Sequence, residues 1–168
     1  MKNIYKGLFK VNKTEELMVY AEEISELTIA ISEYRIKENK ENKKNLIEEI
    51  ADTLIVIDSI ITVYDFNIDR ISYDILSMNY IQILPNLVKC ISKYERNKNS
   101  KTKKHFIDAI IETLKLTKFL IELYNINYKD IHDMIDYKEN KLIDYYEHLK
   151  QESVKNEIKE RCLNLIKK

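Results

Sequence analysis

Apolar residues recur along this chain at spacings of three and four, the period of a helix that buries one face. The clearest stripe lies within residues 14–37, and Asn12 with Glu15 can form a capping box at its start. The members of this stripe are Leu17, Ala21, Ile24, Leu27, Ile31 and Tyr34. A second helix is expected from about Asn45 to Tyr64. Its centre, Ile50 to Val63, is apolar nearly all round, so we expect it to lie deep among other helices.

Polar segments without a helical period follow each of these patterns. Residues 38–44 and 97–102 are expected to be loops. Pro85 is expected to mark a kink or a new first turn within the helical region between them. The further helices are expected at about residues 68–97, 103–124 and from Tyr128 to near the last residue.

Composition narrows the fold class. The 168 residues include one glycine, Gly7, and one proline, Pro85. Sheet proteins need glycine and proline in their turns, and phosphate-cradling loops need several glycines, so a Rossmann fold, a P-loop and a β-sandwich are excluded. An all-α helical bundle remains.

An internal repeat organises this bundle. A shift of 60 residues without a gap aligns residues 22–71 with 82–131 at about 15 identities in 50, where chance would give roughly one in ten. We therefore expect two tandem units that pack as a pseudo-twofold bundle, because neither can cover its apolar face alone. The expected divisions are an N-terminal segment (1–13), an acidic unit (14–81), a degenerate second unit (82–150) and an amphipathic C-terminal helix (151–168).

Two pairs of acids are candidates for chemistry. Glu23 with Glu26, and Glu49 with Asp52, are each spaced by three residues, which puts both members of a pair on one helical face. Two facing helices that each supply such a pair can hold one or two Mg²⁺ ions, with room for water and substrate phosphates. The alternative is that these acids line solvated faces. Asp52 fits that alternative poorly, because its helix has little room for a solvated face.

The second unit has lost most of these acids. At the positions equivalent to Glu23, Glu26, Glu49 and Asp52 it has Ile83, Asn86, Ala109 and Glu112. In return, Lys138 and Lys141 replace Met78 and Ile81 of the first unit. One unit could thus supply a metal site while the other supplies cations for phosphates, although ordinary surface lysines would give the same pattern.

The acids carry a resemblance to a family. The pattern Glu-Glu-x-x-Glu, then 22 residues, then Glu-x-x-Asp, together with the helix sequence NLIEEIADTLIVID, resembles the MazG-like all-α nucleoside triphosphate pyrophosphohydrolases. The segment YNINYKDIHDMIDYKENKLIDYY resembles the last helix of that family. The resemblance covers residues 14–72 well and residues 82–146 as a degenerate second copy.

The resemblance implies a hydrolase that releases a nucleoside monophosphate and pyrophosphate. It implies Mg²⁺, with Mn²⁺ as a substitute, bound by Glu23, Glu26, Glu49 and Asp52. Glu22 and Glu23 would be catalytic, with Glu22 orienting or deprotonating water. Lys138 and Lys141 would contact phosphates.

Two alternatives stay open. The related dimeric all-α dUTPases would imply dUTP or dCTP specificity, but the chain has Leu142-Ile143-Asp144-Tyr145-Tyr146 in place of their Asn-x-x-Arg-Gln stretch. It also lacks tryptophan, and Tyr20, Tyr34 or Tyr94 would have to stack on a base. The other alternative is a catalytically inactive helical module that binds a nucleotide or a protein.

Charge and cysteine usage bear on partners and location. The 28 basic and 28 acidic residues balance, so we expect no nucleic acid partner and, at most, local basic contacts. Two cysteines form no metal pattern, and no long apolar segment is present, which favours a reduced cytoplasmic protein that does not enter a membrane. We expect either a homo-oligomer, most simply a dimer, or an intramolecular pseudo-dimer.

Overall fold

The computed structural model of this chain describes residues 13–68 and 80–145. Within these residues the chain is helical apart from short turns, and it contains no strand, which confirms the all-α prediction. The predicted cap Asn12 and the predicted C-terminal helix at residues 151–168 lie outside the described residues. None of the helices in the two described stretches is both long and apolar enough to cross a bilayer.

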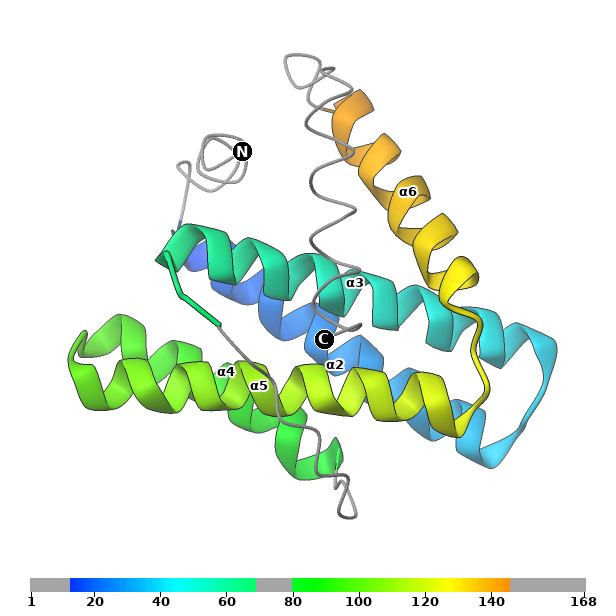
Figure 1. Ribbon diagram of the computed structural model, residues 1–168, viewed down its shortest axis with the longest axis horizontal. Coiled ribbons are helices and arrows are strands. Elements are labelled where there is room, and N and C mark those ends of the chain that lie inside the picture. Colours follow the sequence, from blue (N-terminus) through cyan, green and yellow to red (C-terminus); the bar gives the residue numbers. More distant parts are fainter. Residues whose placement is uncertain (1–12, 69–79, 146–168) are drawn as a thin grey trace.

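Two antiparallel helical hairpins form the body of the molecule (Figure 1). In the first hairpin α2 packs against α3, and in the second α4 packs against α5; the hairpins meet where α2 contacts α4 and α3 contacts α5. The last described helix, α6, packs on α3. The helices are α2 (Lys13–Ile36), α3 (Lys40–Tyr64), α4 (Tyr80–Arg96), α5 (Ser100–Leu123) and α6 (Tyr128–Tyr145).

The ends of the helices repeat at the 60-residue offset. Asn39 and Asn99 cap α3 and α5 with the same extended backbone, φ −134° and −133°, and each side chain accepts a hydrogen bond from the backbone three residues later. After these helices Asp65 and Asn125 adopt left-handed φ values of 53° and 46°. The backbone geometry of these turns is therefore the same in both hairpins, while α5 alone has a reciprocal capping box, between Asn99 and Thr102.

Contacts between the hairpins come in exchanged pairs. The ring of Tyr34 packs edge-on against Tyr124 at 4.9 Å, and the ring of Tyr64 packs edge-on against Tyr94 at 5.7 Å. The 60-residue shift turns Tyr34 into Tyr94 and Tyr64 into Tyr124. Each contact is thus the other with the two hairpins exchanged, which is the geometry of an approximate twofold relation.

One hydrophobic core runs through both hairpins. Side chains that are fully buried include Tyr20, Ile24, Leu27, Leu46, Ile50, Leu54, Ile57, Leu84, Leu87 and Phe106. Of the three tyrosines considered for base stacking, Tyr20 and Tyr34 are buried in this core and Tyr94 is partly buried against it. Tyr20 and Tyr34 are 2% and 8% exposed, and Tyr94 packs in a ring cluster with Tyr64, Phe66 and Phe106.

Two local predictions need correction. Residues 40–44 and 100–102, expected in loops, are the first turns of α3 and α5, and the connections shrink to residues 37–39 and 97–99. These turns look aperiodic because they extend past the core into solvent, while the asparagine caps start the helices earlier. Of the two roles expected for Pro85, a kink or a first turn, the structure excludes the first turn, because Pro85 lies inside α4.

Candidate metal and phosphate site

Three carboxylates meet between α2 and α3. Glu23 from α2 and Glu49 and Asp52 from α3 each place one carboxylate oxygen within 4.8 Å of the others. Glu23 lies one residue before buried Ile24, and Glu49 one residue before buried Ile50, so the packing of the two helices brings their acids together at its margin. The acid spacing of the sequence therefore does produce a cluster.

Glu49 is the least satisfied member of this cluster. Its Oε2 atom is buried and has no hydrogen-bond partner within the described part of the chain. A buried carboxylate oxygen without a partner carries a desolvation cost, which is removed by protonation or by a bound cation.

The pKa values of Glu23 and Glu49 reflect this environment. Burial, followed by the negative charge of Asp52, raises the pKa of each from 4.5 to about 7. The negative charge of Glu26 also raises the pKa of both groups, and that of Glu23 further raises the pKa of Glu49. At neutral pH Glu23 and Glu49 are therefore partly protonated, and full ionisation of the cluster is unfavourable.

Lys138 of α6 closes one side of the cluster. Its Nζ donates to Oδ2 of Asp52 at 2.7 Å and lies 2.7 Å from Oε1 of Glu48. The hydrogen bond from Lys138 lowers the pKa of Glu48. Burial raises the pKa of Asp52 and outweighs the opposing effect of this lysine. Burial lowers the pKa of Lys138, but its bonds to the two carboxylates raise it above its ordinary value.

Lys141 lies near the cluster without pairing to it. Its Nζ is 4.6 Å from the centre of the Tyr137 ring on the same helix. Its positive charge lowers the pKa values of Glu48 and Asp52, so it acts on the same acids at longer range. Of the two lysines singled out in the sequence, the structure brings one into direct contact with the acids.

Glu22 and Glu26 occupy the solvent side of α2. Both are exposed, and neither belongs to the group whose oxygens lie within 4.8 Å. Their charges still raise the pKa of Glu23, and that of Glu26 also raises the pKa of Glu49. They therefore border the cluster on its solvent side.

Glu48 borders the cluster because it shares Lys138 with Asp52, and it was not among the acids expected from the sequence. It lies four residues before Asp52 and so on the same side of α3, a spacing that could have identified it. In the second hairpin, by contrast, Ala109 is buried where Glu49 would stand, and Glu112 is an exposed partner of Lys115 at 3.3 Å. The acid cluster belongs to the first hairpin.

The donor set fits a hard divalent cation. Carboxylate oxygens are the ligands that Mg²⁺ prefers, and neighbouring ligands of Mg²⁺ lie about 3 Å apart, within reach of oxygens already inside 4.8 Å. When Glu23, Glu48, Glu49 and Asp52 are all ionised, Lys138 pairs with Glu48 and Asp52, which leaves the negative charges of Glu23 and Glu49 without a cation in contact. A divalent ion would balance them and would supply the partner that Glu49 Oε2 lacks.

Comparison with known proteins gives no relative for this arrangement. No family model, no curated protein and no solved structure matches the chain.

Proposed function

We propose that this protein is an Mg²⁺-dependent nucleoside triphosphate pyrophosphohydrolase, which cleaves between the α and β phosphates and releases a monophosphate and pyrophosphate. The observation that carries the proposal is the meeting of Glu23, Glu49 and Asp52 beside Lys138. The resemblance of the acid pattern and of its helix to the MazG-like enzymes gives the reaction class.

Each residue has a role that follows from its place. Glu23, Glu49 and Asp52 would hold Mg²⁺ or Mn²⁺, and Glu26, whose charge acts on Glu23 and Glu49, would be a fourth ligand from the solvent side. When bound, the ion neutralises charge on the phosphates and activates a water. Glu22, exposed next to Glu23, can accept a proton from a water molecule on that side.

Lys138 supports phosphate binding by its position and charge. Its ammonium is held beside the acids by two carboxylates, and it keeps a third N–H for a phosphate oxygen. Lys141, already within electrostatic reach of Asp52, extends the positive side of the site. Phosphate binding of this kind needs no glycine-rich loop, because lysine side chains rather than backbone amides would make the contacts.

The direct test is to incubate the protein with each of the common ribo- and deoxyribonucleoside triphosphates and Mg²⁺, and to measure pyrophosphate. We expect release from at least one nucleotide, and a loss of about a hundredfold or more in Glu49→Gln. Glu112→Gln, which changes an exposed acid of the second hairpin, is the matched control and should keep full activity. A wild type indistinguishable from Glu49→Gln on every nucleotide would refute the proposal.

The second candidate is a helical module that binds a nucleotide without hydrolysing it. The ion pair of Lys138 with Asp52 and Glu48 favours it, since a lysine already provides part of the counter-charge. Equilibrium binding of a non-hydrolysable triphosphate, with no turnover of the parent nucleotide, would select this candidate. The burial of Tyr20 and Tyr34 removes two of the side chains that a pyrimidine-specific site could have used for stacking.

A further inference from the structure

The tip of the second hairpin is strongly basic. We define the basic tip as residues 93–105, the end of α4, the turn and the start of α5. It contains six basic residues and a single acid, Glu95. The six are Lys93, Arg96, Lys98, Lys101, Lys103 and Lys104. This local excess stands in a chain whose total charge is zero.

The equivalent tip of the first hairpin provides an internal comparison. Residues 33–45, the first tip, have five basic and three acidic side chains. At the 60-residue offset Glu33 corresponds to Lys93, Ile36 to Arg96, Glu38 to Lys98 and Glu41 to Lys101. The two tips share their cap geometry at Asn39 and Asn99, so the backbone is common and the charge is what differs.

Most of the cations on the basic tip are available to a partner. Lys93, Lys101 and Lys104 are exposed and form no ion pair within the described part of the chain. Glu95 is paired with Lys98 at 3.1 Å, so the single acid neutralises one cation of the six. Lys103 lies 5.3 Å from the centre of the Phe66 ring, a contact that leaves its charge in place.

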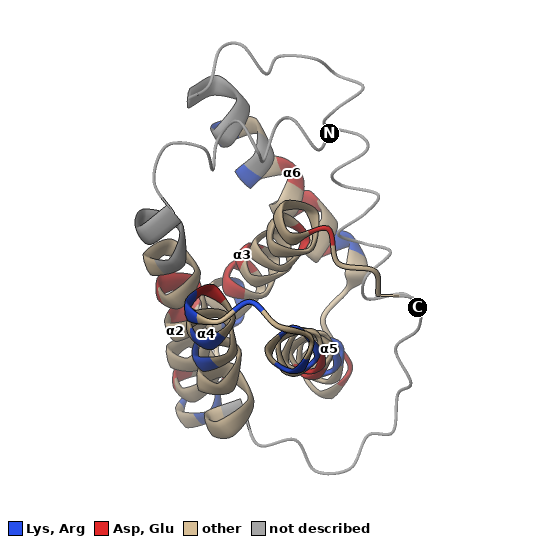
Figure 2. Ribbon diagram, turned by 90° about the vertical axis from the view of Figure 1, so that its left-hand side faces the viewer, with Lys and Arg blue, Asp and Glu red and all other residues tan. Residues whose placement is uncertain are grey.

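The cations are spread over two helices. Lys93 and Arg96 are three residues apart on α4, and Lys101 and Lys104 three residues apart on α5, so each pair shares a helical face. Figure 2 looks onto this end of the hairpin, where blue segments lie on both α4 and α5. Charges distributed in this way suit an extended polyanion better than one small anion, which needs convergent donors.

We propose that the basic tip binds the phosphate backbone of a nucleic acid, without reading its sequence. The ammonium group of lysine is a point charge that pairs with backbone phosphates. Recognition of a base commonly needs a side chain that forms two hydrogen bonds to the base edge in a groove. A membrane surface fits less well, because basic membrane-binding helices also carry exposed large apolar residues. The exposed large apolar residues of the described chain lie elsewhere, at Met18, Val19, Ile29, Ile36, Ile81, Leu123 and Tyr137.

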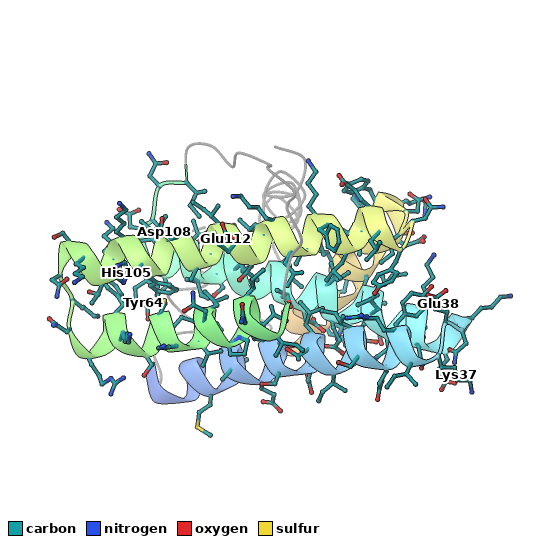
Figure 3. All side chains as sticks on the ribbon, turned by 90° about the horizontal axis from the view of Figure 1, so that it is seen from below. Lys37, Glu38, Tyr64, His105, Asp108 and Glu112 are labelled. Carbon is teal, nitrogen blue, oxygen red and sulfur yellow. The ribbon has the colours of Figure 1, made fainter. Side chains whose placement is uncertain are left out.

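This inference does not depend on the proposed enzymatic function. None of its residues belongs to the acid cluster, and the two tips lie at opposite ends of the molecule. Figure 3 places Lys37 and Glu38 of the first tip at one end and His105 of the basic tip at the other. The expectation of no nucleic acid partner followed from the neutral total charge. A neutral total does not describe the local charge of the basic tip, where six cations lie with one acid.

The test measures binding of a fluorescent 30-nucleotide oligothymidine and a 30-base-pair duplex by anisotropy, in EDTA, at several salt concentrations. The test variant is Lys93→Glu with Lys101→Glu, which installs the acids found at the equivalent positions of the first tip. The matched control is Lys37→Glu with Lys40→Glu, which changes the net charge equally at the opposite end of the molecule. Thermal melts of both variants check that each is folded.

We expect the wild type to bind at about 50 mM salt and to weaken steeply with added salt. The test variant should bind about tenfold or more weakly, with a salt slope reduced by roughly 1.5 to 2, and the control should stay within about twofold of the wild type. Equal binding by wild type and test variant, or an equal loss in the control, would overturn the proposal. Tip-dependent binding to vesicles of anionic phospholipid, with none to either oligonucleotide, would also overturn it.

Discussion

Glu23 and Glu49 are the residues at which burial and mutual repulsion act together. Their acid spacing in the sequence was enough to single them out with Asp52, because a spacing of three on a helix fixes the face. The sequence did not reveal that Glu48 shares Lys138 with Asp52, since that contact joins positions 86 and 90 residues apart. Such partners depend on how α6 packs on α3, which no local pattern encodes.

The raised pKa values predict how the stability of the metal-free protein depends on pH. A carboxyl group with a higher pKa in the folded state stabilises that state fully below its unfolded pKa, and this stabilisation is lost as the pH rises through the folded value. For Glu23 and Glu49 the window runs from about 4.5 to about 7. We expect the melting temperature in EDTA to fall by about 5 °C between pH 5 and pH 8, a value reduced for the partial exposure of both groups.

Glu49→Gln should flatten this dependence, because it removes one of the two titrating groups. Glu112→Gln, outside the cluster, should retain the full slope. The measurement is the melting temperature of the wild type and of both variants at a series of pH values from 5 to 8. A wild-type melting temperature that rises steadily from pH 5 to pH 8 would show that these carboxyls are not buried as described.

Lys138 gives a second prediction at this scale. Lys138→Met leaves Asp52 and Glu48 without their shared cation, and the side chain of Asp52 is only 14% exposed. We expect the free energy of unfolding at pH 8 to fall by about 2 kcal/mol in EDTA, less than for a fully buried pair. Urea denaturation measures it. Lys129→Met, which breaks an exposed pair with Asp133, is the control and should change the midpoint little; an equal loss in both variants would contradict the account.

At the scale of elements, the hydrophobic period located the helices well, and their ends less well. The stripe within residues 14–37 predicted α2 closely, whereas α3 begins five residues before the expected Asn45. The periodic signal fades where a helix leaves the core, yet the backbone continues as long as a cap satisfies its first amides. Asn39 and Asn99 provide that cap, and their matching position 60 residues apart was visible in the sequence.

The two caps should contribute about equally. Asn39→Ala and Asn99→Ala each remove the side-chain acceptor for one amide, and we expect each to lower the free energy of unfolding by about 1 kcal/mol. Chemical denaturation of both variants beside the wild type tests this. A loss at one position with none at the other would mean that the two hairpins do not start their second helices in the same way.

At the scale of the whole molecule, the two hairpins share one core instead of packing as separate bodies. The 60-residue repeat suggested that each needs the other, and the exchanged pairs of tyrosines, Tyr34 with Tyr124 and Tyr64 with Tyr94, are the contacts in which this appears. The identity of these contacts could not be read from the sequence, because the same apolar stripes allow several ways of packing two hairpins.

Phe106 tests this shared core. It is fully buried and contacts rings of both hairpins, among them Phe66 at 5.1 Å and Tyr94 at 5.7 Å. Phe106→Ala should lower the free energy of unfolding by about 3 to 4 kcal/mol, and the variant should still unfold in one transition. Leu123→Ala, on the same helix but 55% exposed, should cost less than about 1 kcal/mol. Two separate unfolding transitions, with only one of them shifted, would contradict a common core.

The proposed function depends first of all on a divalent cation bound by Glu23, Glu49 and Asp52. Titration with Mn²⁺, followed by the electron paramagnetic resonance signal of the free ion, measures it without any nucleotide. We predict saturable binding by the wild type, binding weakened about tenfold or more in Glu49→Gln, and unchanged binding in Glu112→Gln. Equal Mn²⁺ binding by the wild type and Glu49→Gln, or none by either at millimolar concentration, would contradict the claim.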